Sequence, residues 1–423
     1  MNRIVLKKVI KEALDRSLYP GVDREITKKI LLFIERDEII SLSGVRRSGK
    51  TTVFHQLISH IGKPQNSLLI NFEDERLSEF SVNDFDLLIE IFYELTGAEG
   101  RIFMFFDEIQ EVSSWEKWVR RMYDEKKNIK IFVTGSSSAL LSSEFSTLLT
   151  GRTISFVLYP FSFQEYLSFV TKESFSAEKC DKETAARAAV KNHLGSYITD
   201  GGFPAVSGNF SVEILQQYFQ DIIYRDIVRR YQIRDVRLIE ELYRYLFANI
   251  SNPYSFNALK NTFKTGLDTI REYLSYGISA HLFYEHTFFS YSLKESFNRP
   301  RKVYGIDTGL RKAVSFTFSQ DTGRMVENLV YLALRRSSDS LYYFTEKNEI
   351  DFVLKNNDDS LSLFNVCYSD DIPERELKGI ENFSKRSGKK ISGQYIISDS
   401  VEDEYGSIKI IPLWKWLLTT DRV

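Results

Sequence analysis

The sequence predicts an α/β fold in which a parallel sheet fills the first 160 residues and smaller helical and α/β modules follow. Three observations indicate this fold. A glycine-rich loop at 44–51 lies between a β-branched apolar run at 38–43 and a segment with apolar residues at helical spacing at 52–58. A fully apolar run at 102–106 ends in two adjacent acids, and another at 129–133 ends in hydroxyl residues. Buried strands that alternate with helical segments are typical of parallel sheets.

Composition limits the class of protein. A chain of 423 residues is long enough for about two to four domains. The net charge of −2 excludes a cationic surface over the whole molecule, so a nucleic-acid surface would have to be a local patch. Cys180 and Cys367 are the only cysteines, which excludes a disulfide framework and a cysteine-based zinc site. The N-terminus becomes charged after three apolar residues, and no apolar run reaches the roughly 18 residues of a membrane span. We therefore expect a cytoplasmic protein without a membrane segment.

The loop at 44–51 fits G-x-x-x-x-G-K-[ST], the phosphate-binding P-loop, in the strand–loop–helix context that the motif requires. Glycines let successive N–H groups and the helix N-terminus point at phosphate oxygens. Lys50 supplies a charge for the β/γ-phosphates, and Thr51 a hydroxyl for Mg²⁺. The candidate nucleotide-binding residues are Gly44, Val45, Arg46, Arg47, Ser48, Gly49, Lys50, Thr51 and Thr52. The motif predicts a protein that binds a nucleoside triphosphate.

Segments on either side of the P-loop offer further candidates. Residues 1–37 are predicted to be basic and helical, and Tyr19 and Arg24 are candidates for contacts to the nucleotide base. The alternative is that this segment only packs on the sheet. A second strand at 67–72 leads into Glu73, which either reaches the ligand edge of the sheet or solvates the turn.

The run at 102–106 resembles a Walker B strand. Asp107 follows it 57 residues after Lys50, at the place where a carboxylate would hold Mg²⁺. Glu108 is then placed to orient and activate the attacking water as a general base. The presence of both acids favours hydrolysis over binding alone.

Hydroxyl groups follow the strand at 129–133. Thr134 and Ser136 are candidates for sensing the γ-phosphate or the water, and serines here are alternatively caps of the next helix. Arg152 is a candidate arginine finger, supplied by the same subunit or by a neighbour, although it could equally be a surface residue.

The chain resembles one known family. The first half contains the segments GVRRSGKTT, NFEDERL, FFDEIQEVSSWEKWVRRMYD, TGSSSALL and LTGRTISFVLYPFSFQEYL. The second half contains GGFPAV, DIIYRDI, GRMVENLVYLAL and EIDF. Together they look like the AAA-related archaeal-type ATPases, which carry a C-terminal domain of unknown function. The resemblance covers nearly the whole chain.

The resemblance implies a helical lid after the ATPase domain. The segment GGFPAV is similar to the glycine–proline element that touches adenine in signal-transducing ATPases, so Pro204 is a candidate adenine contact. The alternative is that Gly-Gly-x-Pro simply ends a helix. We expect a P-loop domain at 1–160, a helical lid at 161–234, a winged-helix-like domain at 235–302 and a nuclease-like α/β domain at 303–423.

The expected winged helix consists of three helices and a hairpin. Apolar periodicity predicts a helix at 238–249, and shorter helices begin near 255 and 268. Residues 282–284 and 288–293 alternate as a hairpin would. The third helix carries few basic side chains, so double-stranded DNA and a protein partner are both open as ligands of this module.

The last predicted domain is similar to restriction-endonuclease-like folds. Those folds place a helix Glu, a strand Asp and a following Glu/Gln-x-Lys around Mg²⁺. Glu327 and Asp351 match the first two positions, but Asn365 and Cys367 occupy the third pair. Nuclease activity is therefore not expected, and the domain is expected to serve docking or dimerisation. Lys355 and Lys378 are the lysines that could substitute from elsewhere.

The sequence as a whole predicts an Mg²⁺-dependent ATPase that couples its nucleotide state to C-terminal modules. ATP is favoured over GTP because no Asn-Lys-x-Asp tetrapeptide occurs. The expected partners are DNA, another protein or further copies of the chain. Two alternatives stand beside this interpretation: a slow ATP-dependent signalling switch and an ATP-driven DNA-processing nuclease.

Overall fold

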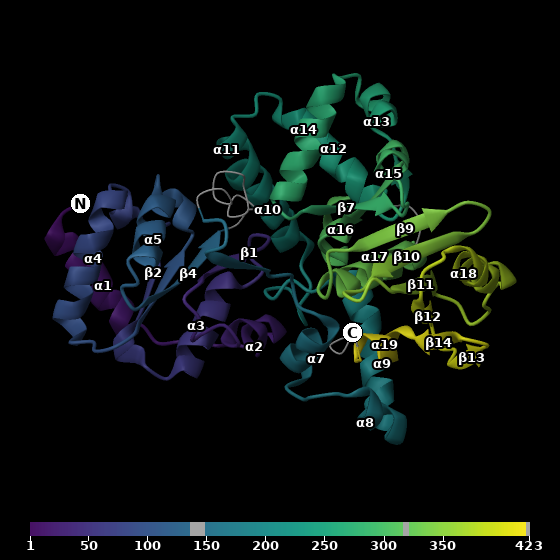
Figure 1. Ribbon diagram of the computed structural model, residues 1–423, viewed down its shortest axis with the longest axis horizontal. Helices are drawn as coiled ribbons and strands as arrows, with labels where there is room; N and C mark the ends of the chain where they lie inside the picture. Colours follow the sequence, from purple (N-terminus) through teal and green to yellow (C-terminus); the bar gives the residue numbers. More distant parts are fainter. Residues whose placement is uncertain (136–148, 316–320, 420–423) are drawn as a thin grey trace. The chain divides into compact units, whose positions relative to one another are not determined.

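The computed structural model describes residues 1–135, 149–315 and 321–419 (Figure 1). The chain forms two compact units. The first comprises Met1–Tyr159 together with Ser279–His281, and the second comprises Pro160–Ile278 and Leu282–Val423. The first unit contains a parallel sheet and the second a mixed sheet. The predicted α/β fold class is thus confirmed, and the predicted domain bounds stay a prediction.

The described part of the first unit contains a five-stranded parallel sheet with the order β2-β3-β4-β1-β5. Its strands are β1 (Ile39–Ser43), β2 (Ser67–Asn71), β3 (Ile102–Asp107), β4 (Ile129–Gly135) and β5 (Thr153–Val157). The segment 44–49 follows β1, and Asp107 is the last residue of β3. Because all strands run in the same direction, the predicted phosphate loop and both predicted acids come to one edge of the sheet.

Helices cover both faces of this sheet (Figure 1). They are α1 (Arg3–Asp15), α2 (Glu25–Leu31), α3 (Lys50–Ile61), α4 (Phe85–Thr96) and α5 (Trp115–Asp124), with 3₁₀ turns η1 (Pro64–Asn66), η2 (Glu75–Leu77), η3 (Val82–Asp84) and η4 (Ile109–Glu111). One core joins α1, α4 and α5 to strand residues such as Met104 and Phe106. The other joins α2 and α3 to Phe103 and Phe105. Neighbouring strand residues point to opposite faces, so the apolar residues 102–106 of β3 supply both cores.

The second unit combines helices with a larger sheet. Its helices are α7 (Phe163–Thr171), α8 (Ala177–Lys182), α9 (Thr184–Asp200), α10 (Val212–Asp221), the π-helix η6 (Ile222–Val228), α11 (Arg229–Tyr231), α12 (Val236–Ala248), α13 (Phe256–Phe263), α14 (Leu267–Ser279), α15 (Leu293–Asn298), α16 (Thr308–Val314), α17 (Thr322–Arg335), α18 (Glu374–Arg386) and α19 (Leu413–Leu417). The strands are β6 (Pro253–Tyr254), β7 (Phe283–Phe288), β8 (Arg301–Gly305), β9 (Leu341–Thr345), β10 (Glu349–Lys355), β11 (Leu361–Cys367), β12 (Ile391–Ser398), β13 (Asp403–Tyr405) and β14 (Ile408–Pro412).

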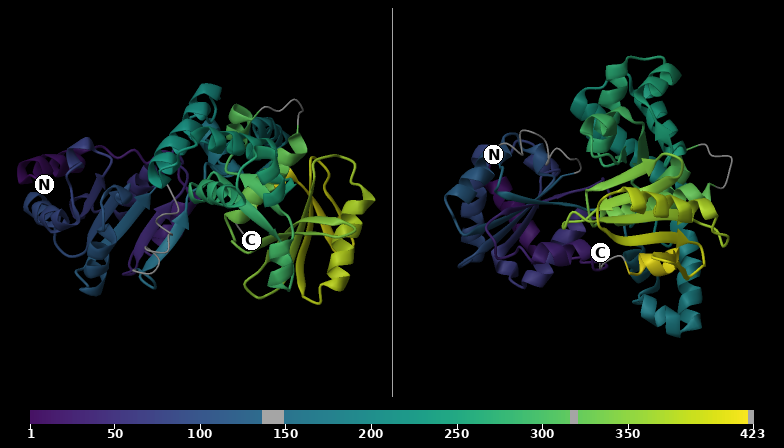
Figure 2. Two further views of the ribbon diagram at one scale, coloured as in Figure 1. Left: turned by 90° about the horizontal axis from the view of Figure 1, so that it is seen from above. Right: turned by 45° about the vertical axis from the view of Figure 1, so that its right-hand side comes forward.

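The nine strands follow the order β13-β14-β12-β11-β10-β9-β7-β8-β6. Pairing is antiparallel between β9 and β10 and between β10 and β11, and parallel between β11 and β12. Helix α18 packs along β10, β11 and β12 (Figure 2). The expected antiparallel pair of strands near 341–354 and the strand at 361–367 are therefore confirmed.

The predicted hairpin at 282–293 is wrong. Residues 283–288 form the single strand β7, which pairs antiparallel with β8 and parallel with β9. The chain then leaves the sheet because Ser292 caps α15, with its side chain accepting a hydrogen bond from the N–H of Glu295. Ser-x-x-Glu is a helix-start signal, and it competes here with the apparent alternation of apolar residues.

Three helices, α12, α13 and α14, form where the sequence predicted them. Strands β6, β7 and β8 nevertheless belong to the same sheet as β9 to β14. The expected winged-helix and nuclease-like segments thus share one sheet, and their division into two domains stays a prediction.

The Gly201-Gly202 pair ends α9 in a tightly packed turn. The N–H of Gly202 donates to the carboxylate of Asp307 at 2.7 Å, and the carbonyl of Gly202 accepts from the N–H of Phe161, also at 2.7 Å. A Cβ on Gly202 would lie 2.5 Å from the carbonyl oxygen of Phe161. This part of GGFPAV therefore has a structural role: the missing side chains let two backbones and a carboxylate meet.

Among the described residues, no helix combines the length and hydropathy that a membrane crossing requires. Cys180 and Cys367 are both free thiols.

We predict that Gly202→Ala destabilises the second unit. The added methyl group would have to displace the Phe161 carbonyl, and overpacking of this kind costs about 1–3 kcal/mol. Calorimetry should show a lower transition temperature. Gly323→Ala is the control, because nothing lies within 4 Å of a Cβ at this helical glycine, and alanine should leave stability unchanged or slightly higher. Equal transition temperatures for the two variants would contradict the prediction.

Candidate functional site

The loop between β1 and α3 has the backbone of a phosphate-binding loop. Gly44 has φ 151° and Gly49 has φ 99°, both in the region that favours glycine. A Cβ on Gly44 would lie 2.3 Å from the carbonyl oxygen of Leu158. The loop ends at the N-terminus of the twelve-residue helix α3. The first N–H groups of a helix have no partner within it and carry a partial positive charge, so the loop and helix can bind an anion.

Lys50 lies inside this loop. Its side chain is buried, and the ammonium donates to the carbonyl of Gly44 at 3.1 Å. The same nitrogen lies 3.8 Å from a carboxylate oxygen of Glu108. The structure thus brings together the predicted phosphate-binding lysine and the predicted general base.

Asp107 joins two hydroxyl groups. One carboxylate oxygen accepts a hydrogen bond from Thr51 Oγ1 at 2.6 Å, and the other accepts one from Thr134 Oγ1. Asp107 is buried, and burial raises its pKa; the neighbouring carboxylate of Glu108 acts in the same direction. A cation that approaches this carboxylate would stabilise its charged form.

The oxygen atoms of Thr51 and Asp107 fit Mg²⁺. Magnesium prefers oxygen ligands and is commonly held by one or two protein groups together with substrate phosphates and water. Among residues 1–135, 149–315 and 321–419, no group of three or more His, Cys, Asp or Glu side chains could hold a metal by itself. The pair therefore suits an ion that arrives with a nucleotide.

Glu108 has an unusual backbone. Its φ is 52°, a left-handed conformation that non-glycine residues adopt mainly at turns and functional sites. Its N–H donates to Thr134 Oγ1 at 3.0 Å, and its Oε2 accepts from the amide of Gln110 at 2.6 Å. Gln110 was not identified from the sequence, although it lies only two residues after the predicted base.

Thr134 occupies the centre of the sheet edge. It lies on β4, between the P-loop strand β1 and the acid-bearing strand β3. Its hydroxyl is fully buried and contacts both Asp107 and the backbone of Glu108. Ser136, the other predicted sensor, lies outside the described residues.

Arg24 lies beneath the P-loop. Its guanidinium donates to the carbonyl of Ser48 at 2.9 Å and to the carbonyl of Tyr159 at 2.6 Å, and the residue is 2 % exposed. The expectation that Arg24 contacts the base is therefore wrong, and the packing alternative holds for it. Tyr19 is 72 % exposed, and its N–H donates to His55 Nδ1. Glu73 accepts from Arg46 of the loop at 3.0 Å, which places it at the ligand edge.

The remaining candidates lie elsewhere. Arg152 precedes β5, whose first residue Thr153 pairs with Ile39 at the start of β1. This is the end of the parallel strands opposite the P-loop, and Arg152 pairs with Asp124 at 2.8 Å. A role in its own subunit's site is therefore wrong, whereas a role in a neighbour's site stays a prediction. Pro204 follows α9 in the second unit, and its adenine contact also stays a prediction.

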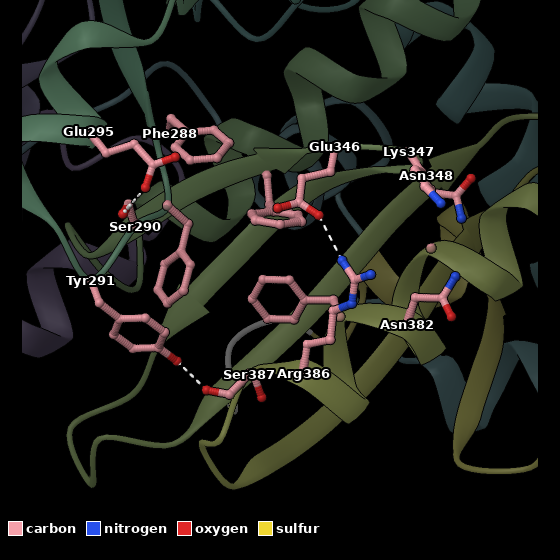
Figure 3. Close-up of a pocket in the computed structure, with 14 residues that line it drawn as sticks. Phe288, Ser290, Tyr291, Glu295, Glu346, Lys347, Asn348, Asn382, Arg386 and Ser387 are labelled. Atoms are coloured by element: carbon pink, nitrogen blue, oxygen red, sulfur yellow. Dashed lines mark hydrogen bonds and ion pairs between the residues drawn. The ribbon is translucent and has the colours of Figure 1, made fainter.

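The second unit contains a separate pocket of about 390 Å³ between β7, the β9–β10 turn and α18 (Figure 3). Phe288, Phe289, Phe344 and Phe383 contribute aromatic walls. At its rim, Arg386 pairs with Glu346 at 2.8 Å (Figure 3). The lining thus combines aromatic rings with charged and amide side chains such as Lys347, Asn348 and Asn382.

Three family models match the chain: "AAA domain" at 36–167, "Domain of unknown function (DUF8612)" at 191–321 and "Domain of unknown function (DUF4143)" at 322–416. An uncharacterized protein of Methanocaldococcus jannaschii, MJ1544, is 34 % identical over 444 residues, which covers 99 % of this chain and 96 % of the relative. An uncharacterized protein of Haemophilus influenzae is 28 % identical over 409 residues, with 92 % and 97 % covered.

Two solved structures are also similar. The Thermotoga maritima RuvB Holliday junction branch migration motor is 18 % identical, with a TM-score of 0.32 and coverage of 62 % of this chain and 89 % of that one. The Aeropyrum pernix Orc1 protein in complex with DNA is 13 % identical, with a TM-score of 0.30 and coverage of 74 % and 96 %.

We predict that Arg24→Met destabilises the first unit. The substitution keeps much of the side-chain length but leaves the carbonyls of Ser48 and Tyr159 without this donor, and a buried unpaired polar group costs about 1–3 kcal/mol. Urea unfolding should show a lower midpoint. Arg36→Met is the control: Arg36 is 58 % exposed and pairs with Glu38 on the surface, where ion pairs contribute little. A midpoint equal to that of the control would show that Arg24 does not stabilise the loop.

Proposed function

We propose that this chain is an Mg²⁺-dependent ATPase. The chain belongs to the same family as the M. jannaschii protein MJ1544 and carries an AAA domain. One observation carries the proposal: Asp107 joins the hydroxyls of Thr51 and Thr134, and the next residue, Glu108, lies beside Lys50. Phosphate-binding, metal-binding and proton-accepting groups thus meet at the carboxyl edge of one parallel sheet.

The loop would bind the triphosphate. N–H groups from Val45 to Thr52 and the partial charge of the α3 N-terminus supply the anion site. Lys50 already lies inside the loop, held by the Gly44 carbonyl. When phosphate oxygens compete for the ammonium, Lys50 can exchange this carbonyl for them with little movement.

Thr51 and Asp107 would hold Mg²⁺. An ion held by these two residues would supply positive charge beside the phosphates. The Thr51 hydroxyl lies against the Asp107 carboxylate, so two oxygen ligands are already adjacent. Thr134 restrains the other carboxylate oxygen and thereby fixes the direction of the first.

Glu108 would act as the general base. A base must lie within hydrogen-bond reach of the water whose proton it accepts. Gln110 holds one oxygen of Glu108, and Lys50 faces the other. This arrangement keeps the carboxylate at the phosphate side of the site.

The nucleotide state would be communicated to the second unit, whose ligand is DNA, a protein or another copy of the chain. A slow signalling switch is the first alternative, because the same site could hold ATP and hydrolyse it rarely. A DNA-processing nuclease is the second. Pro204 and, from a neighbouring subunit, Arg152 are proposed as additional contacts to nucleotide.

We predict distinct effects for two substitutions in the site. Lys50→Ala should weaken ATP binding at least about tenfold, because a charge that faces the phosphates is lost. Glu108→Gln should keep ATP binding and lower steady-state hydrolysis about 10²- to 10⁴-fold, the usual contribution of a general base. Calorimetric titration and phosphate release measure the two effects. Glu35→Gln is the matched control, because the side chain of Glu35 is 85 % exposed.

The same assay with added duplex DNA separates a DNA-dependent ATPase from the signalling switch. Stimulation by DNA would support a DNA-dependent ATPase. Negligible hydrolysis with micromolar ATP binding would favour the switch. Full activity of Glu108→Gln would overturn its role as base.

We also predict that Thr134→Val lowers kcat about 10- to 100-fold with little change in KM. The variant keeps the shape of the side chain but loses hydrogen bonds to a carboxylate and to the backbone of Glu108, and a hydrogen bond to a charged group contributes about 1.5–3 kcal/mol. Thr134→Ser keeps the hydroxyl and should retain most activity. An equal loss in both variants would indicate that the methyl group, and not the hydroxyl, is needed.

A further inference from the structure

Three acidic side chains of the second unit surround one lysine. Lys302 lies on β8, Glu327 on α17, and Glu349 and Asp351 on β10. The Lys302 ammonium lies 2.8 Å from a Glu349 oxygen, 3.1 Å from a Glu327 oxygen and 3.8 Å from an Asp351 oxygen. Glu327 and Asp351 are the two residues that match the metal ligands of restriction-endonuclease-like folds.

Lys302 is enclosed at this position. The residue is 2 % exposed, although lysine is almost never fully buried without charged partners. The hydroxyl of Tyr304 donates to the same Glu327 oxygen at 2.6 Å. The cluster therefore joins β8, β10 and α17 through a cation that belongs to the chain itself.

The other candidate residues are engaged elsewhere. Asn365 accepts from the N–H of Asp351 at 3.2 Å and donates to Glu376 at 2.8 Å, so its amide links β10 to α18. Lys355 pairs with Asp359 and Lys378 with Glu374, each on the surface. Neither of these two lysines therefore takes the missing position.

We propose that Lys302 is a built-in cation that takes the place of a divalent metal in this carboxylate cluster. A metal ion would have to occupy the position between the three carboxylates. The Lys302 ammonium already occupies that position, and two cations cannot share it. The residues present therefore do not fit Mg²⁺, and the cluster serves as a charged cross-link of the sheet. This inference is independent of the ATPase proposal.

Manganese binding to the full-length protein tests the proposal. The single variant Asp351→Asn should bind the same number of Mn²⁺ ions as wild type, as measured by electron paramagnetic resonance. Lys302→Met should bind one more Mn²⁺ ion than wild type does, and Lys302→Met combined with Asp351→Asn should lose that additional ion. Thermal unfolding should show that Mn²⁺ stabilises Lys302→Met but not wild type.

The proposal would be overturned if wild type bound an Mn²⁺ ion that Asp351→Asn removed, because the cluster would then be a metal site in its native form. A folded Lys302→Met that bound no additional Mn²⁺ would also overturn it. Lys302→Gln, which keeps a donor toward the carboxylates, replaces Lys302→Met if the latter does not fold. If both Lys302 variants fail to fold, the comparison of wild type with Asp351→Asn still tests whether the native cluster binds Mn²⁺, and loss of a bound ion in Asp351→Asn would overturn the proposal.

Discussion

The hydrogen bonds from Thr51 and Thr134 to Asp107 connect three segments that lie far apart in the sequence. They join the start of α3, the end of β3 and the end of β4 through a single buried carboxylate. The strand order, with β4 between β1 and β3, is what allows both hydroxyls to reach it. These hydrogen bonds also set the positions of Lys50 and Glu108, because Lys50 precedes Thr51 and Glu108 follows Asp107 in the sequence.

Most of the P-loop unit could be predicted because its signals are local. A loop that needs positive φ at Gly44 and Gly49 must carry glycine there, and a strand that supplies two cores must be apolar throughout, as residues 102–106 are. The motif spacing then places Asp107 and Thr134 at the same sheet edge. These features are visible in sequence because each depends on neighbouring residues alone.

Other features could not be predicted because they depend on distant partners. Arg24 bonds to Tyr159, 135 positions away, and nothing near Arg24 distinguishes a buried arginine from an exposed one. Nothing in the sequence near Lys302 marks it as buried, because its partners lie on α17 and β10. The hairpin prediction failed for a different reason: the cap at Ser292 was present in the sequence but was outweighed by apolar alternation.

The two acidic sites differ in how their charge is balanced. In the first unit, burial raises the pKa of Asp107, its partners are neutral hydroxyls, and Lys50 approaches Glu108 instead. In the second unit, an ammonium from β8 faces three carboxylates directly. A buried carboxylate whose hydrogen-bond donors are neutral favours the reversible binding of a cation. A carboxylate cluster that contains a lysine already has a cation from the chain and does not require a bound one. We therefore expect a cation to bind with the nucleotide at the P-loop, whereas ion pairs within the chain cross-link the sheet of the second unit.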